Sequence, residues 1–569
     1  MLQLYPWLAE RSLVIIEWLL VLPVLGMIFL RRRKRPIAPA FQSCERWFHA
    51  MARRETISMA AVGLLCLCLR VALLPVLGVP EPGVHDEFSY LLAADTFAHG
   101  RLTNPAHPMW VHFESFHIIH QPTYMSMYPP GQGLALALGQ RLGHPWIGVL
   151  LTTALLCSVL CWMLQAWLPP SWALFGGILA VLRLGLLSYW MNTYWGGSLA
   201  AIGGALVLGA LPRLKRDPRS RDALLLGLGL AMLANTRPYE GVALSVPVAL
   251  ALLVWIISAK RPLLPALLTR VAAPIILILV VMLAAIGYYN RRVTGSAWHM
   301  PYAVNVATYQ IAPPFLWQRP RPVPVYHHPV MRAFYINWLQ KYYDYQGLWG
   351  FCRHTLDLVV RQWSFYIGPA LTMALLAFPR LLRDRHMRAP LTIGAVFVVA
   401  LGLETWIQPH YFAPATALLY LIMLQCLRHL QQWHWHERAV GAAMVRAVPL
   451  ICCAMVVLRL SAILTHAQIE PQWPRGNLER ADVARRLEDL PGQQLVIVHY
   501  GPSHDPDHEW VYNAADIDHA KVVWARDMGQ QANQELLQYF RNRQVSMVFP
   551  DESPIPIEPV TTPSTVALP

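Results

Sequence analysis

The sequence predicts an all-α polytopic membrane bundle of about twelve spanning helices, with a small C-terminal α/β domain outside the membrane. Three observations predict this fold class. Of the 569 residues, 56% are hydrophobic and only 14% are charged, whereas about a quarter of the residues in a soluble domain are charged. The hydrophobic residues form long blocks with few charges, as transmembrane helices do. Beyond residue 464 these blocks give way to alternating strand-like and helical runs.

Each long hydrophobic block is predicted to be one span. The blocks cover 13–30, 57–77, 146–167, 172–190, 198–212, 223–235, 240–258, 268–288, 363–382, 391–407, 410–427 and 441–463. Basic residues cluster between the blocks, at 31–35 with 53–54, 213–221, 260–261, 380–388 and 428–438. If every basic cluster lies in the cytoplasm, as the positive-inside rule expects, all twelve spans can cross the membrane in alternating directions. Membrane orientation therefore explains the net charge of +14, and nucleic acid is not expected as a partner.

Three regions of the chain follow from this topology. Residues 1–54 are predicted to be an extra span with a basic cytoplasmic linker, because the charges at 31–35 follow the first block, whereas a cleavable signal peptide has them in front. Residues 55–463 form the transmembrane core, with outer loops at 78–145 and 289–362. Residues 464–569 form the outer domain.

Two segments outside the predicted spans also show signals of regular structure. The stretch 131–143 is either a short span or a helix on the surface. The C-terminal region shows strand-like runs at 495–500, 521–525 and 545–549 and a helical stretch near 533–543, which indicates an α/β domain. The Pro-rich residues after 550 are expected to be loose.

The first outer loop has the densest set of reactive side chains. Asp86 and Glu87 follow the end of a span by about nine residues, and carboxylates at a membrane interface are costly unless they are paired or used. One interpretation is that an acidic side chain here takes a proton from an acceptor hydroxyl. The alternative is that the pair caps a helix predicted over 87–99.

Basic and aromatic residues accompany this pair on the outer side. Arg237 lies in a tight turn, and Arg291 and Arg292 follow the span 268–288, although most basic residues near spans should be cytoplasmic. Phosphate bound at the interface explains them, because guanidinium groups bind phosphate in a bidentate manner; snorkelling headgroup anchors are the alternative. Further candidates for substrate binding are Arg101, Tyr128, Tyr194 and Trp195. For the three aromatic residues, the alternative is that they belong to the aromatic belt at the membrane interface.

Metal ligation is a separate hypothesis. His112, Glu114, His117 and His120 supply ligand types within nine positions, and His117 and His120 would share one helix face at i and i+3. The sequence requires no cofactor, and a divalent metal at His117 and His120 stays open. A second polar cluster at 504–509 follows a predicted strand, where it is either a solvated loop or a ligand loop.

Several motifs together resemble a known family. They are Val84-His85-Asp86-Glu87-Phe88-Ser89-Tyr90 before an Ala-rich helix, His99-Gly100-Arg101-Leu102, and Tyr128-Pro129-Pro130-Gly131. This pattern resembles the first outer loop of the GT-C glycosyltransferases, above all the bacterial relatives of protein O-mannosyltransferases and of the aminoarabinose transferase acting on lipid A. The turn with Arg237 and Gly241 is similar to a later outer turn of that family. The resemblance covers roughly residues 55–460.

The resemblance implies a GT-C fold and transfer of a sugar, with inversion, from a polyprenyl-phosphate donor to an acceptor on the outer face. The resemblance also implies that Asp86 is the catalytic base, that Glu87 supports it, and that Arg237 contacts the donor phosphate. Tyr128 stands where aminoarabinose transferases have Lys, so the acceptor stays open among glycan, lipid and protein. The expected location is the inner membrane of a bacterium, with the active site and C-terminal domain extracytoplasmic.

Other classes of function remain as alternatives. A transporter or flippase for an anionic lipid or sugar would explain the span count and the outer arginines, yet the sequence shows no inverted repeat and few ionisable residues within the spans. A non-catalytic sensor leaves the large polar outer loops unexplained. An oligosaccharyl ligase with a diphosphate-linked donor is not distinguished from the favoured enzyme.

Overall fold

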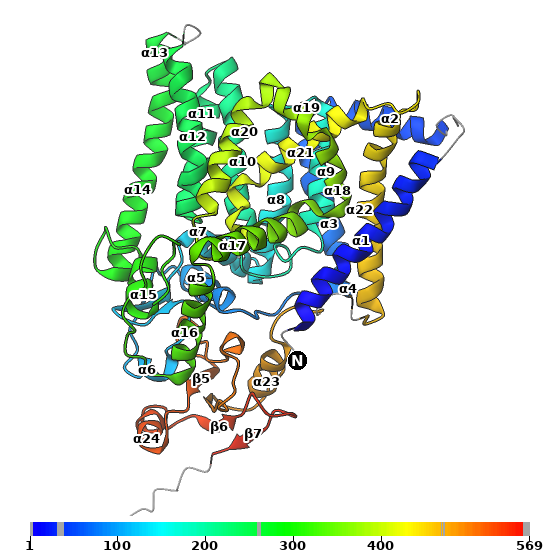
Figure 1. Ribbon diagram of the computed structural model, residues 1–569. Coiled ribbons are helices and arrows are strands. Elements are labelled where there is room, and N and C mark those ends of the chain that lie inside the picture. Colours follow the sequence, from blue (N-terminus) through cyan, green and yellow to red (C-terminus); the bar gives the residue numbers. More distant parts are fainter. Residues whose placement is uncertain (1–3, 31–38, 259–262, 468, 470–472, 561–569) are drawn as a thin grey trace, which may run out of the picture.

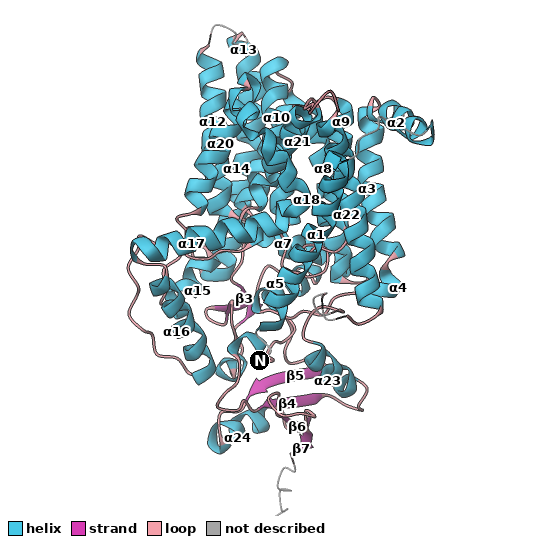
Figure 2. Ribbon diagram, turned by 45° about the vertical axis from the view of Figure 1, so that its right-hand side comes forward, coloured by secondary structure: helices cyan, strands magenta, loops and turns pink. Residues whose placement is uncertain are grey.

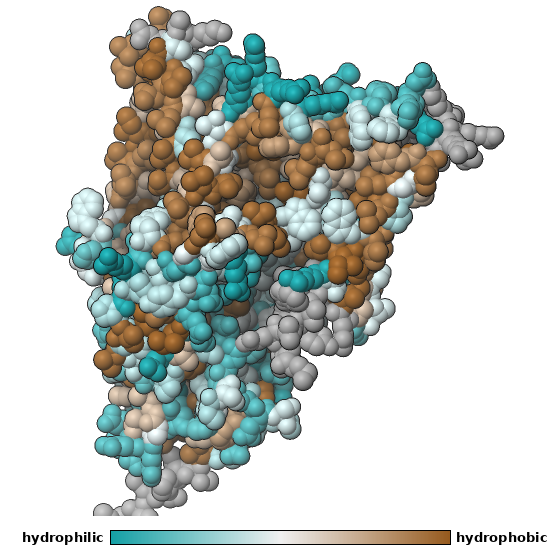
Figure 3. Space-filling model, viewed as in Figure 1, coloured by the Kyte–Doolittle hydropathy of each residue, from teal (hydrophilic) through white to brown (hydrophobic). Residues whose placement is uncertain are grey.

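The protein is a bundle of long helices with a small α/β domain at one end (Figure 1). This computed structural model describes residues 4–30, 39–258, 263–467, 469 and 473–560. The predicted basic clusters at 31–35 and 260–261 lie outside the described residues. On the face that Figure 3 shows, a broad apolar band covers the long helices, with hydrophilic surface below it and along much of its upper border, as expected for a protein that crosses a bilayer.

Within the described ranges, nine helical segments are long and apolar enough to span a membrane. They are Arg11–Leu30, Glu55–Ala72, Pro145–Gln165, Ser198–Arg216, Pro238–Ile257, Leu264–Thr294, Gly347–Arg383, Ala413–Gln431 and Val440–Leu464. The other three predicted spans fall on shorter helices, at Pro170–Gly185, Ser220–Ala234 and Arg388–Leu401. The all-α polytopic class is therefore confirmed, while the count of about twelve spans stays a prediction.

Small residues let the central helices approach closely. The bundle helices labelled in Figure 1 include α3 (Glu55–Ala72), α8 (Pro145–Gln165), α9 (Pro170–Ala180), α10 (Ser198–Arg216), α11 (Ser220–Ala234), α12 (Pro238–Ile257), α14 (Ala273–Thr294), α20 (Arg388–Leu401), α21 (Thr416–Gln431) and α22 (Val440–Leu464). Most residues of α10 are buried. A Cβ added at Gly204 would lie 1.8 Å from the carbonyl oxygen of Pro414, so only glycine permits this backbone contact.

The extra N-terminal helix α1 (Leu4–Leu30) is attached to the bundle by a buried ion pair. Arg183 Nη1 lies 3.2 Å from Glu17 Oε1, which also accepts a hydrogen bond from the backbone N–H of Ala370 at 3.1 Å. Both charged side chains are largely buried, and burial of an ion pair is tolerated only with such additional partners. The helix runs beside α22 and α18 (Gly368–Thr372) (Figure 1).

The segment between the second and third long helices folds into short elements. Helix α4 (Leu74–Leu77) extends α3, and α5 (His85–Ala98), α6 (Trp110–Phe113) and α7 (Pro130–Arg141) follow. The strands β1 (Asn104–Pro105), β3 (Thr123–Ser126) and β2 (Ile118–Ile119) form a small antiparallel sheet in that order. Helix α7 has 12 residues and is therefore about 18 Å long, too short for a hydrocarbon core of about 30 Å. The stretch 131–143 is thus a short helix and does not span.

The second large connection lies at the same end of the bundle. It contains α15 (Pro301–Tyr309), α16 (Pro329–Asp344) and α17 (Gly347–Gln362). In both ribbon views α17 crosses the long helices near the edge of the bundle (Figures 1 and 2). It exposes Leu348, Trp349 and Leu356 while it buries His354 and Leu358, a pattern typical of a helix at a membrane interface.

The C-terminal region is an α/β domain with a four-stranded sheet (Figure 2). The sheet order is β5 (Val522–Arg526), β4 (Gln494–Val498), β6 (Gln544–Val548), β7 (Ile557–Pro559), with α23 (Leu478–Glu488) and α24 (Gln530–Tyr539) packed beside it. The first three strands are parallel and β7 is antiparallel to β6. The three predicted strands are confirmed. The expectation of a loose chain after 550 is wrong for 557–559, because these residues form the edge strand β7, which pairs with β6.

Candidate active site

The candidate site is built around the first turn of α5. Glu87 closes this turn, because its Oε2 accepts hydrogen bonds from the backbone N–H groups of Gly83 at 2.8 Å and Val84 at 3.1 Å. Its Oε1 accepts a third from the N–H of Tyr194 at 2.8 Å. Burial raises the pKa of Glu87 to about 7, although the three N–H donors oppose this shift. Glu87 therefore caps the helix and anchors the Tyr194 turn, with its oxygens occupied.

Asp86, one residue earlier, points elsewhere and keeps an accessible oxygen. Its side chain is 19% exposed and lies at the positive end of the α5 dipole. Tyr128 donates its hydroxyl hydrogen to Oδ1, and His117 Nδ1 lies 3.8 Å from Oδ2. The Tyr128 ring stacks on Tyr90 with ring centroids 4.5 Å apart. Burial and the nearby Asp86 carboxylate raise the pKa of Tyr128 well above its usual value, so this phenol remains a hydrogen-bond donor.

Arg237 supplies a positive charge at the first residue before α12. Its Nη1 lies 3.6 Å from Glu240 Oε1, and its guanidinium carbon lies 4.5 Å from the centre of the Tyr411 ring. Burial lowers the pKa of Arg237, but Glu240 and the surrounding tyrosine hydroxyls raise it more, so the group stays charged. Its side chain is 19% exposed. The N–H of Gly131 donates to Asn235 O at 2.9 Å, which fastens the start of α7 to this turn.

Asp86 and Arg237 act on the same tyrosine side chains. Both charges act on Tyr90. Burial and the Asp86 carboxylate raise the pKa of this tyrosine, and Arg237 opposes the shift. Both also act on Tyr302, where burial and the neighbouring carboxylates raise the pKa to about 12 while Arg237 opposes. A carboxylate and a guanidinium are thus held beside the same tyrosines.

Sequence reasoning missed several members of the cluster. Glu404, His410 and Tyr411 lie between α20 and α21; Glu404 and His410 are buried and Tyr411 is partly buried. Tyr411 lies under Arg237, and the His410 ring lies 4.8 Å from that of Trp195. The signal available was small: Glu404 lies near the end of the predicted span 391–407, and His410 begins the predicted span 410–427.

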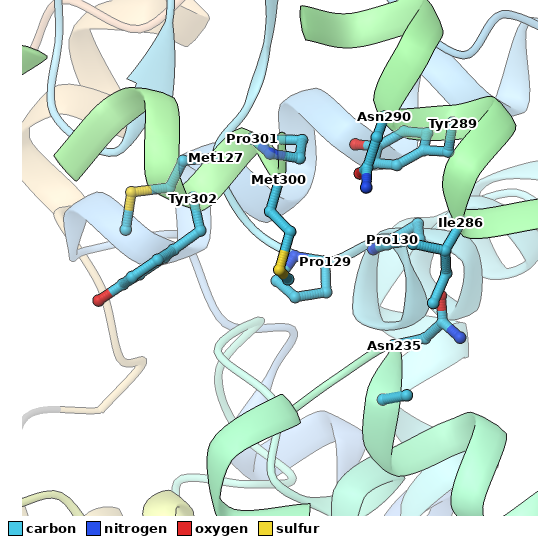
Figure 4. Close-up of a pocket in the computed structure, with 11 residues that line it drawn as sticks. Met127, Pro129, Pro130, Asn235, Ile286, Tyr289, Asn290, Met300, Pro301 and Tyr302 are labelled. Carbon is cyan, nitrogen blue, oxygen red and sulfur yellow. The ribbon is translucent and has the colours of Figure 1, made fainter. Parts of the chain in front are cut away.

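A small apolar groove, with about 20 Å³ of free space, adjoins the charged cluster (Figure 4). Met127, Pro129 and Pro130 form one wall, and Tyr302 connects the groove to Asp86 and Arg237. The remaining lining residues come from the turn before α12, from α14 and from the start of α15: Ala234, Asn235, Ile286, Tyr289, Asn290, Met300 and Pro301. Helix α14 presents exposed apolar side chains over its length, so the groove lies beside a lipid-facing surface (Figure 3).

Other predicted site residues lie outside this cluster. Arg291 and Arg292 are exposed on α14. Arg101 contributes to the lowered pKa of Asp516 in the C-terminal domain, after the larger effect of His519. Tyr194 is buried and donates its hydroxyl to Pro80 O at 2.9 Å. Trp195 lies at the edge of the cluster through its contact with His410.

The proposed histidine ligand pair is not assembled. His117 faces Asp86 and Tyr128, whereas His120 Nε2 accepts the backbone N–H of Ser115 at 3.1 Å. Glu114 instead accepts hydrogen bonds from Tyr309 at 2.7 Å and from His327 at 2.9 Å. In the part of the chain that the structure describes, no group of three or more His, Cys, Asp or Glu side chains is arranged to hold a metal ion.

The C-terminal domain packs directly on α5. Tyr512 stacks on Phe88 with ring centroids 4.0 Å apart, and its hydroxyl lies 2.6 Å from His85 Nδ1. From the polar cluster 504–509, Asp507 Oδ1 lies 3.8 Å from His85 Nε2. This domain therefore borders the candidate site within one residue of Asp86.

Comparison with known proteins gives structural neighbours only. No family model and no curated protein sequence matches this chain. The structure is similar to ArnT from Cupriavidus metallidurans in the apo state, with a TM-score of 0.48 and 13% identity over 86% of this chain and 92% of that one. It is similar to the Archaeoglobus fulgidus oligosaccharyltransferase in complex with Zn and sulfate, with a TM-score of 0.44 and 10% identity over 86% and 67% of the two chains.

Proposed function

We propose that this protein is a membrane glycosyltransferase that moves a sugar from a polyprenyl-phosphate donor to a hydroxyl group of an acceptor at the outer face. One observation carries the proposal: the charges of Asp86 and Arg237 both act on Tyr90 and Tyr302, and Tyr302 also lines the apolar groove. A lipid-phosphate sugar needs these three features, namely an apolar path, a cation for the phosphate and a base near the sugar.

The donor phosphate is placed at Arg237. The distance of 3.6 Å to Glu240 exceeds that of a strong hydrogen bond, so the guanidinium keeps donors for a phosphate, which it binds in a bidentate manner. The first isoprene units would lie against the apolar surface at Pro129 and Pro130, and the rest of the chain would follow the exposed apolar side of α14. A structure of ArnT bound to undecaprenyl phosphate is among the similar ones, with 13% identity and a TM-score of 0.45.

The reaction follows from the positions of the two carboxylates. Asp86 takes the proton of the acceptor hydroxyl while that oxygen forms a bond to the anomeric carbon. The bond from this carbon to the phosphate oxygen breaks, its electron pair leaves with the phosphate, and Arg237 stabilises the added negative charge. Glu87 is occupied by backbone N–H groups and is not available as a nucleophile. A single displacement with inversion is therefore the mechanism we favour.

The orientation in the membrane follows from the basic residues. Helix α10 begins beside the Tyr194 turn and ends with Arg213, Lys215 and Arg216, about 28 Å further along its axis. The positive-inside rule assigns that distant end to the cytoplasm and thus the site and the C-terminal domain to the outside. Because nucleotide sugars are made in the cytoplasm, an outer site needs a sugar carried by a lipid. We place the protein in the inner membrane of a bacterium.

The experiment is a transfer assay in membranes that contain the enzyme and a labelled pool of polyprenyl-phosphate sugars. Asp86→Asn should lower incorporation of label into membrane acceptors by at least about 10²-fold, as expected for loss of a general base. Asp489→Asn, at an exposed position on the C-terminal domain, is the matched control and should keep full activity. Full activity of Asp86→Asn would refute the mechanism. Label that crosses the bilayer with its bond to phosphate intact would support the transporter instead.

A further inference from the structure

His117 adopts a backbone conformation that non-glycine residues rarely use. Its φ is 58°, in the left-handed region, where an L-residue is less stable by about 1 kcal/mol or more. Two hydrogen bonds hold this conformation, because the His117 carbonyl accepts from Ser89 Oγ at 2.7 Å and from Met127 N at 3.1 Å. Strain retained by such support concentrates at functional sites.

The strained backbone places the imidazole beside Asp86 and Tyr128. His117 Nδ1 lies 3.3 Å from the Tyr128 hydroxyl oxygen and 3.8 Å from Asp86 Oδ2. The phenol has one hydrogen, which it donates to Asp86 Oδ1, so its oxygen is left to accept a hydrogen bond. The neutral imidazole with its hydrogen on Nδ1 supplies that donor and completes a chain from His117 through Tyr128 to Asp86. Each bond of such a chain strengthens the next.

The rest of the surroundings keep the ring in place and add little charge. Phe334 and Trp338 of α16 pack against it with ring centroids 6.0 Å and 5.8 Å away, and the His85 ring lies 5.8 Å away on α5. Burial lowers the pKa of His117, while Asp86 opposes this shift. Asp86, His85 and Tyr128 are the titratable groups that face the ring, so the imidazole is neutral at neutral pH and does not cancel the charge of Asp86.

We propose that His117 is a positioning residue for the base: it fixes the Tyr128 hydroxyl toward Oδ1 of Asp86 and so leaves Oδ2 directed at the acceptor hydroxyl. This inference rests on the proposed glycosyl transfer. In this proposal Tyr128 and His117 act together to orient the Asp86 carboxylate. It also explains why a histidine, and not a glycine, stands at a left-handed position.

Three substitutions separate the ring from the backbone. His117→Gly keeps the backbone conformation and removes the ring, whereas His117→Asn tolerates the same backbone and returns an N–H donor. In the transfer assay, His117→Gly should lower kcat by about tenfold or more, as for loss of one hydrogen bond in the chain that holds the base, with KM for the donor unchanged. His117→Asn should recover part of kcat. Tyr128→Phe should lower kcat similarly, and adding His117→Gly to it should cause no further loss.

His436 provides a matched control, because it is exposed and has a φ of 44°. His436→Gly should leave kcat unchanged and, because the ring is exposed, should change the melting temperature little. Wild-type kcat in His117→Gly, or fully additive losses in the double variant, would overturn the inference. A loss of kcat in His117→Gly that is fully explained by its lower melting temperature would overturn the inference as well. The proposed function fails separately, when Asp86→Asn stays active.

Discussion

At the scale of single residues, two adjacent carboxylates have different surroundings and different roles. Glu87 is surrounded by three backbone N–H groups, whereas Asp86 faces Tyr128 and His117. The sequence predicts an acidic pair at the membrane interface and offers both a base and a helix cap as roles. It does not say which residue has which role, because that depends on the Tyr194 turn, which only the folded chain brings to Glu87.

Burial of Glu87 gives stability a pH dependence that can be measured. The folded protein keeps this proton up to about pH 7, whereas a Glu in an unfolded chain releases it near 4.5. The unfolded state thus binds fewer protons between these values, so the free energy of unfolding falls as the pH rises through this window, by up to about 3 kcal/mol. Melting temperatures in detergent should fall between pH 5 and pH 7.5 for the wild type and less for Glu87→Gln.

The exposed Glu488 is a suitable comparison for this titration. Glu488→Gln should keep the slope of the wild type. If Glu87→Gln and wild type lose melting temperature in parallel across the window, Glu87 is ionised in the folded protein and the buried, protonated state described above is wrong.

At the scale of elements, α5 lies between the membrane bundle and the C-terminal domain. The helix is predicted over 87–99 and is found over 85–98, since its Ala-rich sequence and capping residues are local signals. The expected helix face of His117 and His120 is wrong, because α6 ends at Phe113 and β2 starts at Ile118. Spacing at i and i+3 aligns two side chains only where the chain is helical.

The contact between α5 and the C-terminal domain should be essential to stability. Phe88 is 8% exposed, stacks on Tyr512 and has the Arg480 guanidinium 4.8 Å from its ring centre. Truncating a buried Phe costs about 3–5 kcal/mol, so Phe88→Ala should lower the melting temperature by several degrees and reduce transfer. Phe351→Ala, at an exposed position of α17, should change neither. An unchanged melting temperature in Phe88→Ala would show that the two parts are not coupled there.

At the scale of the whole molecule, hydropathy predicts the helices but not their neighbours. Every predicted span falls on a helix, because a long apolar block is a local property of the sequence. Tyr411 contacts Arg237, and Glu17 reaches Arg183, across long stretches of sequence that no periodicity relates. The buried members of the site therefore appear only once the bundle is packed.

The assigned orientation can be tested on intact cells. Trp298 is 92% exposed near the start of α15, and Ser220 is exposed at the start of α11, at the opposite end of the bundle. In a variant whose nine native cysteines are replaced, a membrane-impermeant maleimide should label Trp298→Cys in intact cells, and should label Ser220→Cys only after the cells are permeabilised. The positive-inside rule is the physical reason. Labelling with the opposite pattern would place the site in the cytoplasm and remove the need for a lipid-linked sugar.

The central claim is that Arg237 binds the phosphate of a polyprenyl lipid beside Asp86. Its most direct test is the binding of undecaprenyl phosphate to the purified protein, measured by native mass spectrometry or by displacement of a labelled analogue. Arg237→Ala should weaken binding by about tenfold or more, because a charge-assisted hydrogen bond pair is lost. Asp86→Asn and Arg292→Ala should bind as the wild type does. Unchanged binding in Arg237→Ala, or a loss confined to Arg292→Ala, would contradict the account.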